Sequence, residues 1–276
     1  MATAAHHGSY RIMGVVNVTP DSFSDGGRFL SAEAAIAHGL ALVREGADIL
    51  DIGGESTRPG ADEVPADEER ARVIPVVEAL KAKTDAALSI DTRKPEVAAD
   101  AMAAGASIWN DVSALTYSPD SLRVAADLDC DIVLMHAQGD PRTMQDNPHY
   151  GDVVEEVYDF LADRVDACLR AGVDPSRLVV DPGVGFGKKL EHNLALIANL
   201  KRFSEIGRPV LLGASRKRFI SALDREGPAD QRLGGSLAAA LAGLQGGAGI
   251  FRVHDVAATR QALSVAAAIH NALEKP

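Results

Sequence analysis

The sequence is poor in cysteine and in positive charge. Two cysteines, Cys130 and Cys168, stand far apart in 276 residues and form no CxxC pair, so neither a disulfide framework nor a cysteine-bound zinc site is indicated. We therefore expect a reducing compartment, the cytoplasm. The formal net charge of -11 has the wrong sign for a protein that binds phosphate backbones or anionic lipid. We accordingly expect neither nucleic-acid nor membrane partners.

Long hydrophobic runs are also missing. No segment approaches the roughly 18 consecutive apolar residues of a membrane span, and residues 1–8 have neither the basic start nor the apolar run of a signal peptide. No Pro/Gly/Ser-rich linker or charge block divides the rest of the chain. We expect residues 1–10 to form a flexible tail and residues 11–276 to form a single domain.

What the chain does have is a regular alternation of short apolar runs, rich in branched residues, with longer amphipathic stretches. This alternation is typical of βαβ units and of a parallel sheet. Eight such runs, in a chain near the roughly 250 residues of a single α/β barrel, favour a closed (β/α)8 TIM barrel, with an open doubly wound sheet as the alternative. The expected strands are 11–16, 48–54, 87–91, 107–111, 131–136, 178–183, 209–215 and 250–255.

The intervening segments predict helices. The clearest runs from Asp152 to about Arg170, where apolar residues recur every three or four positions. Another begins at Pro95, because proline's missing N–H costs nothing at the first helical position. The small residues of 233–249 predict a helix packed closely against the barrel.

Polar residues end every expected strand. One such residue alone is typical of a turn or a helix cap. Eight ends together, at the rim where barrels of this class carry their active sites, indicate a cup of amides and carboxylates suited to a flat polar heterocycle. The residues are Asn17, Asp51, Asp91, Asn110 with Asp111, His136, Asp181, Ser215 and His254.

Three connections after strands are longer than the usual roughly 2 to 6 residues, and we expect them to act as lids. The second of them offers Thr57 beside Arg58, which fits equally a solvated arginine and a phosphate grip. The three connections are 17–30, 53–66 and 137–151.

A few local cations must hold any anionic ligand in so acidic a chain. Arg252 and His254 share one face of the eighth strand by period-two alternation, and Lys217 is the cation best placed after the seventh. The glycine-rich string DPGVGFGK at 181–188 lacks the spacing of a P-loop and of a dinucleotide fingerprint. Mg²⁺ brought by a phosphate substrate would need only one or two protein oxygens.

Eight strings, in order along the chain, resemble the dihydropteroate synthases, which are pterin-binding barrel enzymes. The match runs from about residue 11 to the C-terminus and falls on strand ends and long loops. NVTPDSFSDGG carries most weight, because the related pterin-binding methyltransferases have different first loops. The strings are MGVVNVTPDSFSDGG, GGESTRPG, SIDTRKPEVA, NDVSA, MHAQGDPRTMQDNPHY, DPGVGFGK, GASRKRF and RVHDV.

The resemblance implies a site in three parts. Catalytic roles would fall to Asp91, Asp181, Lys217 and Asn17. The pterin would be bound by Asp91, Asn110, Val112, Met135, Asp181, Gly213 and Lys217. The pyrophosphate would be bound by Asn17, Thr57, Arg58, Arg252 and His254. The p-aminobenzoate would be bound by Phe23, Thr57, Pro59, Phe186 and Lys217. Asp25 would take part in loop closure, and Asn17 would also be a ligand of the cofactor, Mg²⁺.

The resemblance also implies a reaction. In folate biosynthesis, 6-hydroxymethyl-7,8-dihydropterin pyrophosphate would lose pyrophosphate in an SN1-like step, and the arylamine of p-aminobenzoate would attack to give 7,8-dihydropteroate. The partners would be these small-molecule substrates, sulfonamides as competitive inhibitors, and a second copy of the chain in a homodimer. A tetrahydrofolate methyltransferase and a non-catalytic pterin-binding paralogue are the alternatives.

Overall fold

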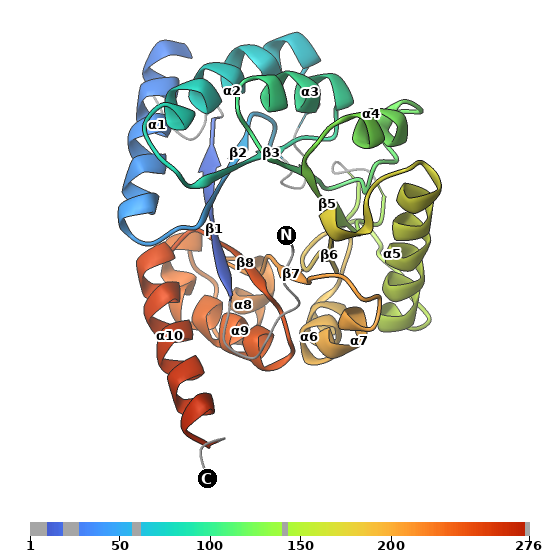
Figure 1. Ribbon diagram of the computed structural model, residues 1–276. Coiled ribbons are helices and arrows are strands. Elements are labelled where there is room, and N and C mark those ends of the chain that lie inside the picture. Colours follow the sequence, from blue (N-terminus) through green and yellow to red (C-terminus); the bar gives the residue numbers. More distant parts are fainter. Residues whose placement is uncertain (1–9, 19–27, 57–61, 140–142, 274–276) are drawn as a thin grey trace.

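A computed structural model describes residues 10–18, 28–56, 62–139 and 143–273. Eight parallel strands form one sheet in the order β6-β5-β4-β3-β2-β1-β8-β7. A parallel bridge between Val180 and Val210 joins the two outer strands, so the sheet curves into a barrel (Figure 1). The prediction of a (β/α)8 barrel is confirmed, and the open-sheet alternative is wrong. The strands are β1 (Arg11–Asn17), β2 (Ile49–Gly53), β3 (Ala87–Asp91), β4 (Ile108–Asp111), β5 (Asp131–Met135), β6 (Leu178–Asp181), β7 (Leu211–Leu212) and β8 (Ile250–Val253).

Helices surround the barrel (Figure 1). α5 begins where predicted, because the Asp152 carboxylate accepts hydrogen bonds from the backbone N–H groups of Val154 and Glu155 at 3.0 and 3.2 Å. α3 begins at Pro95. The helices are α1 (Arg28–Arg44), α2 (Ala66–Lys81), α3 (Pro95–Ala103), α4 (Ser121–Asp127), α5 (Val153–Arg170), α6 (Leu190–Ala198), α7 (Leu200–Ser204), α8 (Arg218–Leu223), α9 (Leu233–Gln245) and α10 (Val256–Leu273), with 3₁₀ turns η2 (Pro175–Arg177) and η3 (Ala229–Arg232).

The segment 233–249 does contain a helix in close contact with the barrel, α9, although this helix ends at Gln245. A methyl group added at Gly243 of α9 would lie 2.4 Å from the Leu212 side chain of β7, so only a residue without a side chain permits this approach. β7 itself is shorter than the predicted run 209–215, because only Leu211 and Leu212 pair as a ladder with β8.

Alternation along the strands produces two separate apolar clusters. Side chains on the outer face, such as Leu50, Trp109 and Leu134, pack in one large cluster under the helices. Side chains on the inner face fill the barrel interior near the N-terminal ends of the strands. This inner cluster consists of Met13, Ile49, Ile108, Val133, Val179, Leu211 and Ile250.

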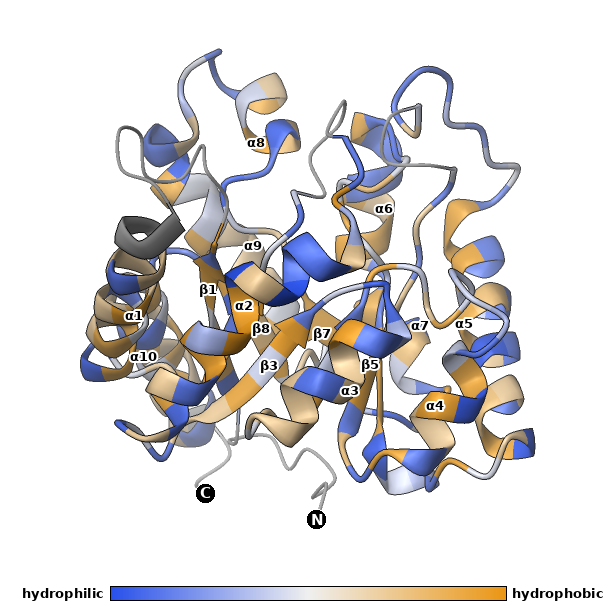
Figure 2. Cartoon of the chain, turned by 90° about the horizontal axis from the view of Figure 1, so that it is seen from above, coloured by the Kyte–Doolittle hydropathy of each residue, from blue (hydrophilic) through white to orange (hydrophobic). Residues whose placement is uncertain are grey.

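The polar end of the barrel is the one at which the strands finish. In Figure 2 the loops at the end of the barrel opposite to the two chain termini are largely hydrophilic, and the strands between are largely hydrophobic. No helix in the described ranges combines the length and the apolar character that crossing a bilayer requires.

Candidate active site at the C-terminal ends of the strands

A layer of charged and amide side chains lies inside the barrel, two residues beyond the inner apolar cluster. Its centre is Asp51 of β2, which is fully buried. The Asp51 carboxylate accepts hydrogen bonds from Ser89 Oγ at 2.6 Å, Asn110 Nδ2 at 3.1 Å and Arg252 Nε at 2.6 Å. Side chains from β3, β4 and β8 are thereby joined to one carboxylate on β2.

Arg252 bridges two carboxylates. Its Nη2 donates to Asp91 Oδ2 at 2.7 Å while its Nε donates to Asp51. Burial opposes the charge of Arg252, but Asp51 and Asp91 outweigh this effect and raise the pKa of Arg252. Burial also raises the pKa of Asp91 to about 7, although the charge of Arg252 counteracts it.

The contact with Asp51 orients the amide of Asn110. Because Nδ2 donates to Asp51, Oδ1 lies on the other side of the amide as an acceptor. Asn110 is next to Asp91 in the register of β3 and β4, so an acceptor of hydrogen bonds and a carboxylate stand side by side. Such a pair can accept from adjacent N–H donors of a planar heterocycle.

Asp181 and Lys217 form the opposite side of the cup. Asp181 Oδ1 accepts from the Gly183 backbone N–H at 2.7 Å. Burial raises the pKa of Asp181, and the charge of Lys217 counteracts it. Burial lowers the pKa of Lys217 to about 7, with Asp181 acting in the opposite direction. Lys217 Nζ donates to the Val184 carbonyl and lies 4.3 Å from the centroid of the Phe186 ring.

The remaining predicted pterin residues lie beside these groups. Met135 is the register partner of Asp181 across β5 and β6. A methyl group added at Gly213 would lie 3.9 Å from Asp181 Oδ2 and 3.8 Å from Arg252 Cβ, so Gly213 leaves room between them. Val112 is buried directly after β4.

Asn17 and His254 lie at the rim. Asn17 ends β1, half-buried, in register with Gly53. His254 follows β8, and its Nδ1 is 3.1 Å from Ser215 Oγ, which also accepts from the His254 backbone N–H at 3.2 Å. Ser215 therefore fixes the position of His254 on the same face as Arg252.

Two other polar strand ends are Asp111 and His136. The Asp111 carboxylate accepts from the backbone N–H groups of Ser113 and Leu115 at 2.7 and 2.8 Å, so it caps a turn and does not line the cup. His136 Nδ1 is 2.9 Å from Lys188 Nζ. The prediction that Asp111 lines the cup is therefore wrong, and the prediction for His136 stays a prediction, with Lys188 as a contact of its ring.

Five predicted site residues lie outside the described ranges. They are Phe23, Asp25, Thr57, Arg58 and Pro59.

The structure also brings together charged residues for which no role was predicted. Glu55, after β2, is hydrogen-bonded by Arg93 Nη2 at 2.7 Å and by Lys94 Nζ at 2.5 Å, and it accepts from the Val64 backbone N–H at 3.1 Å. Lys94 also donates to Glu69 at 2.8 Å. Burial raises the pKa of Glu55, but Lys94 and Arg93 outweigh it and lower the pKa overall. The only signal in the sequence is the pair of cations in SIDTRKP.

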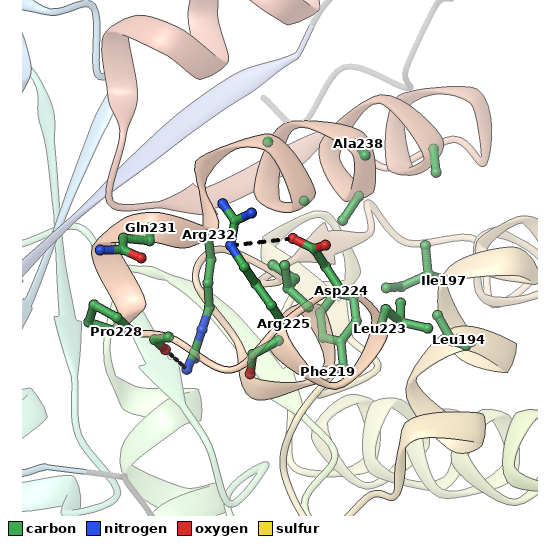
Figure 3. A pocket seen from close by; sticks show the side chains of 17 residues that line it. Leu194, Ile197, Phe219, Leu223, Asp224, Arg225, Pro228, Gln231, Arg232 and Ala238 are labelled. Carbon is green, nitrogen blue, oxygen red and sulfur yellow. Dashed lines mark hydrogen bonds and ion pairs between the residues drawn. The ribbon is translucent and has the colours of Figure 1, made fainter.

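A separate cavity of about 530 Å³ lies between α6, α8 and α9 (Figure 3). Apolar side chains such as Leu194, Ile197 and Phe219 line it, with Asp224 and Arg225 among its polar residues. None of its lining residues belongs to the charged layer, so it takes no part in the chemistry of the cup.

Residues 13–254 match the model of the family described as pterin binding enzyme. The chain is 49% identical over 263 residues to the dihydropteroate synthase of Haemophilus influenzae, with 95% of this chain and 94% of that protein covered.

Solved structures of dihydropteroate synthases also resemble this chain in fold and sequence. Dihydropteroate synthase from Xanthomonas albilineans with 4-aminobenzoic acid has a TM-score of 0.90 at 54% identity, covering 97% of this chain and 94% of that one. The same enzyme in complex with 7,8-dihydropteroate has a TM-score of 0.87 at 49% identity, covering 99% of this chain and 97% of that one. The enzyme from Yersinia pestis in a sulfonamide drug complex has a TM-score of 0.90 at 42% identity, covering 95% of this chain and 95% of that one. The chain belongs to the dihydropteroate synthases within the pterin-binding enzymes.

Proposed function

We propose that this protein condenses 6-hydroxymethyl-7,8-dihydropterin pyrophosphate with p-aminobenzoate to give 7,8-dihydropteroate and pyrophosphate. The observation that carries the proposal is the layer of buried Asp91, Asn110 and Asp181, with half-buried Lys217, around Arg252 at the C-terminal end of the strands. Relatives at 49% identity or more carry the same activity in their name, and two structures bind 4-aminobenzoic acid or 7,8-dihydropteroate.

The charged layer suits the pterin ring. Carboxylates of Asp91 and Asp181 can accept from the ring's amino and N–H groups, Asn110 Oδ1 adds an acceptor, and Lys217 supplies a donor. Met135, Val112 and the space at Gly213 would complete the walls of this pocket.

The same groups support an SN1-like displacement. When the bond to pyrophosphate breaks, positive charge spreads over the pterin, and fixed carboxylates in a buried cup stabilise it without rearrangement. Asp91 and Asp181 take this role, while Arg252 and His254 lie on one face of β8 and after it, where they can stabilise the departing anion. The amine of p-aminobenzoate then attacks the exocyclic methylene and loses a proton.

We propose Mg²⁺ as the cofactor, brought with the pyrophosphate. Asn17 fits this role, because its side chain offers a hard oxygen donor at the rim, and Mg²⁺ is usually held by few protein oxygens together with substrate phosphates. The bound ion would neutralise charge on the leaving pyrophosphate. Thr57 and Arg58 would help to hold this group.

The aminobenzoate would lie against Phe186 and the stem of Lys217, whose Nζ is 4.3 Å from the centroid of the Phe186 ring. Phe23, Thr57 and Pro59 would complete this part of the site, and Asp25 would take part in closure. We propose that sulfonamides compete for the same place, as the complex of the Yersinia pestis enzyme with such a drug supports.

We also propose a homodimer in the cytoplasm. Two large apolar side chains one turn apart on α10, Val265 and Ile269, are exposed at 55% and 60%. Such a surface favours burial against a second copy. Both cysteines are free and buried, which suits a reducing compartment.

The direct test is Mg²⁺-dependent release of pyrophosphate from the pterin pyrophosphate, measured with and without p-aminobenzoate together with detection of dihydropteroate. Product that disappears when p-aminobenzoate is omitted supports the proposal. Pterin binding without product, by protein shown to be folded, contradicts it and favours a methyltransferase or a non-catalytic paralogue.

A further inference from the structure

The loop after β6 is held by an unusual set of side chains. Four successive backbone carbonyls, those of residues 184–187, each accept a hydrogen bond from a different side chain. The donors are Lys217 to Val184, Gln145 to Gly185 at 2.7 Å, Lys188 to Phe186 at 3.0 Å, and Tyr150 to Gly187 at 2.9 Å. Gln145 and Tyr150 belong to the long connection after β5.

The two loops are also in backbone contact. A methyl group added at Gly183 would lie 1.8 Å from the His136 carbonyl oxygen, and one added at Gly187 would lie 2.5 Å from that of Gln138. Both glycines have positive φ, +67° and +61°, which side chains rarely adopt. No other residue type permits this approach, so the loops after β5 and β6 pack as one unit.

Lys188 is buried between the two loops and contacts both of them. Its buried ammonium lies 2.9 Å from His136 Nδ1, 3.2 Å from the His136 carbonyl and 3.0 Å from the Phe186 carbonyl. Three acceptors thus surround this Nζ, although burial lowers the pKa of Lys188 well below its usual value. Burial, reinforced by the charge of Lys188, lowers the pKa of His136 to about 3, so Nδ1 stays an acceptor across the neutral pH range.

The braced loop carries the groups proposed to contact aminobenzoate. The Phe186 ring packs against Lys217 Nζ, whose hydrogen-bond acceptor, the Val184 carbonyl, is in the same loop. A methyl group added at Gly185 would lie 2.7 Å from Lys217 Cδ, so the Lys217 stem lies directly over this loop. A shift of residues 184–187 would therefore move the ring and the cation together.

We propose that Gln145, Tyr150 and Lys188 are positioning residues for the aminobenzoate end of the site, and that the loop after β5 braces this end. None of the three needs to contact substrate. The proposal rests on the proposed function, because it assigns the Phe186 side of the cup to aminobenzoate.

The main test is Tyr150→Phe, which removes only the hydroxyl group that holds the Gly187 carbonyl. One hydrogen bond corresponds to a rise of about 2- to 10-fold in KM for p-aminobenzoate, with smaller changes in KM for the pterin pyrophosphate and in kcat, because Lys217 also faces the pterin. Tyr158→Phe, in which Tyr158 packs on Arg202 outside the cup, is the matched control and should leave all three constants unchanged. Equal rises in both KM values, or none, contradict the proposal.

Lys188→Met extends the test, with the exposed Lys201→Met as its control. It should raise KM for p-aminobenzoate more than Tyr150→Phe does, because it removes the contacts of Nζ with the Phe186 carbonyl, the His136 carbonyl and His136 Nδ1 together, whereas Tyr150→Phe removes one hydrogen bond.

Hydrogen exchange of the peptide spanning residues 183–187 supplies a readout that needs no catalysis. Exchange should be faster in Tyr150→Phe than in wild type and in Tyr158→Phe, with the rest of the barrel unchanged. If the wild type makes no dihydropteroate, the proposed function is contradicted. If exchange in Tyr150→Phe is unchanged, the proposal that Tyr150 holds the loop after β6 in place is contradicted.

Discussion

The two ends of the barrel interior differ although the same strands build both. Ile49 and Asp51 stand two residues apart on one face of β2, as do Ile250 and Arg252 on β8. The first member of each pair belongs to the inner apolar cluster. The second belongs to the hydrogen-bonded charged layer. Between two successive inward-facing positions of a strand, the residue type changes from apolar to charged. This change separates the apolar cluster from the charged layer.

The two layers contribute differently to stability. Apolar burial at the start of the strands is favourable. The charged layer instead keeps its groups at a desolvation cost, visible in the pKa of Asp91, which burial raises to about 7, and that of Lys217, which burial lowers to about 7. Its groups are tolerated because they pair with one another, as Arg252 does with two carboxylates.

Removing bulk from the apolar layer should cost the most. Ile49→Ala is expected to lower the free energy of unfolding by about 2–5 kcal/mol, because Ile49 is fully buried. Denaturant titration measures the loss, and kcat of the remaining folded protein should stay at the wild-type value. A loss of kcat with normal stability would break the separation of the two layers.

The complementary change in the charged layer is Asp91→Asn. We expect kcat/KM to fall by about 100-fold, since a fixed charge facing the reaction is removed. The unfolding midpoint should change little, because the neutral amide avoids the burial cost of the carboxylate while Arg252 loses one of its two charged partners. Steady-state kinetics with a thermal scan measure both, and full activity would remove Asp91 from the proposed role.

Asp51→Asn tests a residue that orients other groups of the layer. Arg252 would keep only Asp91 as its charged partner. The single oxygen of the new amide could not accept from Ser89, Asn110 and Arg252 together. A small misplacement of Arg252 and Asn110 should lower kcat/KM by roughly 10- to 100-fold. Ser89→Ala, which removes one hydrogen bond to Asp51 and leaves the ion pair, should have a weaker effect, and the reverse order would contradict this account of Asp51.

The pH profile should reflect the same layer. Asp91 has a raised pKa of about 7 and loses its charge as the pH falls, whereas Lys217 has a lowered pKa of about 7 and loses its charge as the pH rises. The value of kcat/KM should therefore decline on both sides of neutrality. In Lys217→Arg the basic decline should move up by at least about one pH unit, because arginine stays charged. An unmoved basic decline would mean that another group titrates there.

The parts of the molecule that could be predicted from sequence are those set by local pattern. The eight strands and α5 follow from periodicity and from the Asp152 cap. The Arg252 contact with Asp51 could not be predicted, because it joins residues 201 positions apart and period-two alternation places each side chain on a face without giving its partner. For the same reason Arg252 was expected at the pyrophosphate alone, although in the structure it also holds two carboxylates.

Loop length was a weaker guide than strand pattern. The connection 137–151 was expected to be a lid, but its described residues Gln145 and Tyr150 donate to the loop after β6. That packing depends on Gly183 and Gly187, whose positive φ values bring the two backbones together. A glycine-rich string indicates that its backbone can adopt positive φ, but it does not indicate which other loop that backbone will contact.

The most direct test of the central claim, that the charged layer binds the pterin and the apolar layer does not, is calorimetric titration of a dihydropterin into wild type, Asp181→Asn and Val179→Ala. Asparagine can still accept from the Gly183 N–H, so the loop after β6 keeps this contact. We predict that Asp181→Asn lowers affinity by about 10- to 100-fold, since a hydrogen bond to a charged group is lost, and that Val179→Ala leaves affinity unchanged. Equal affinity in Asp181→Asn and wild type would contradict the account.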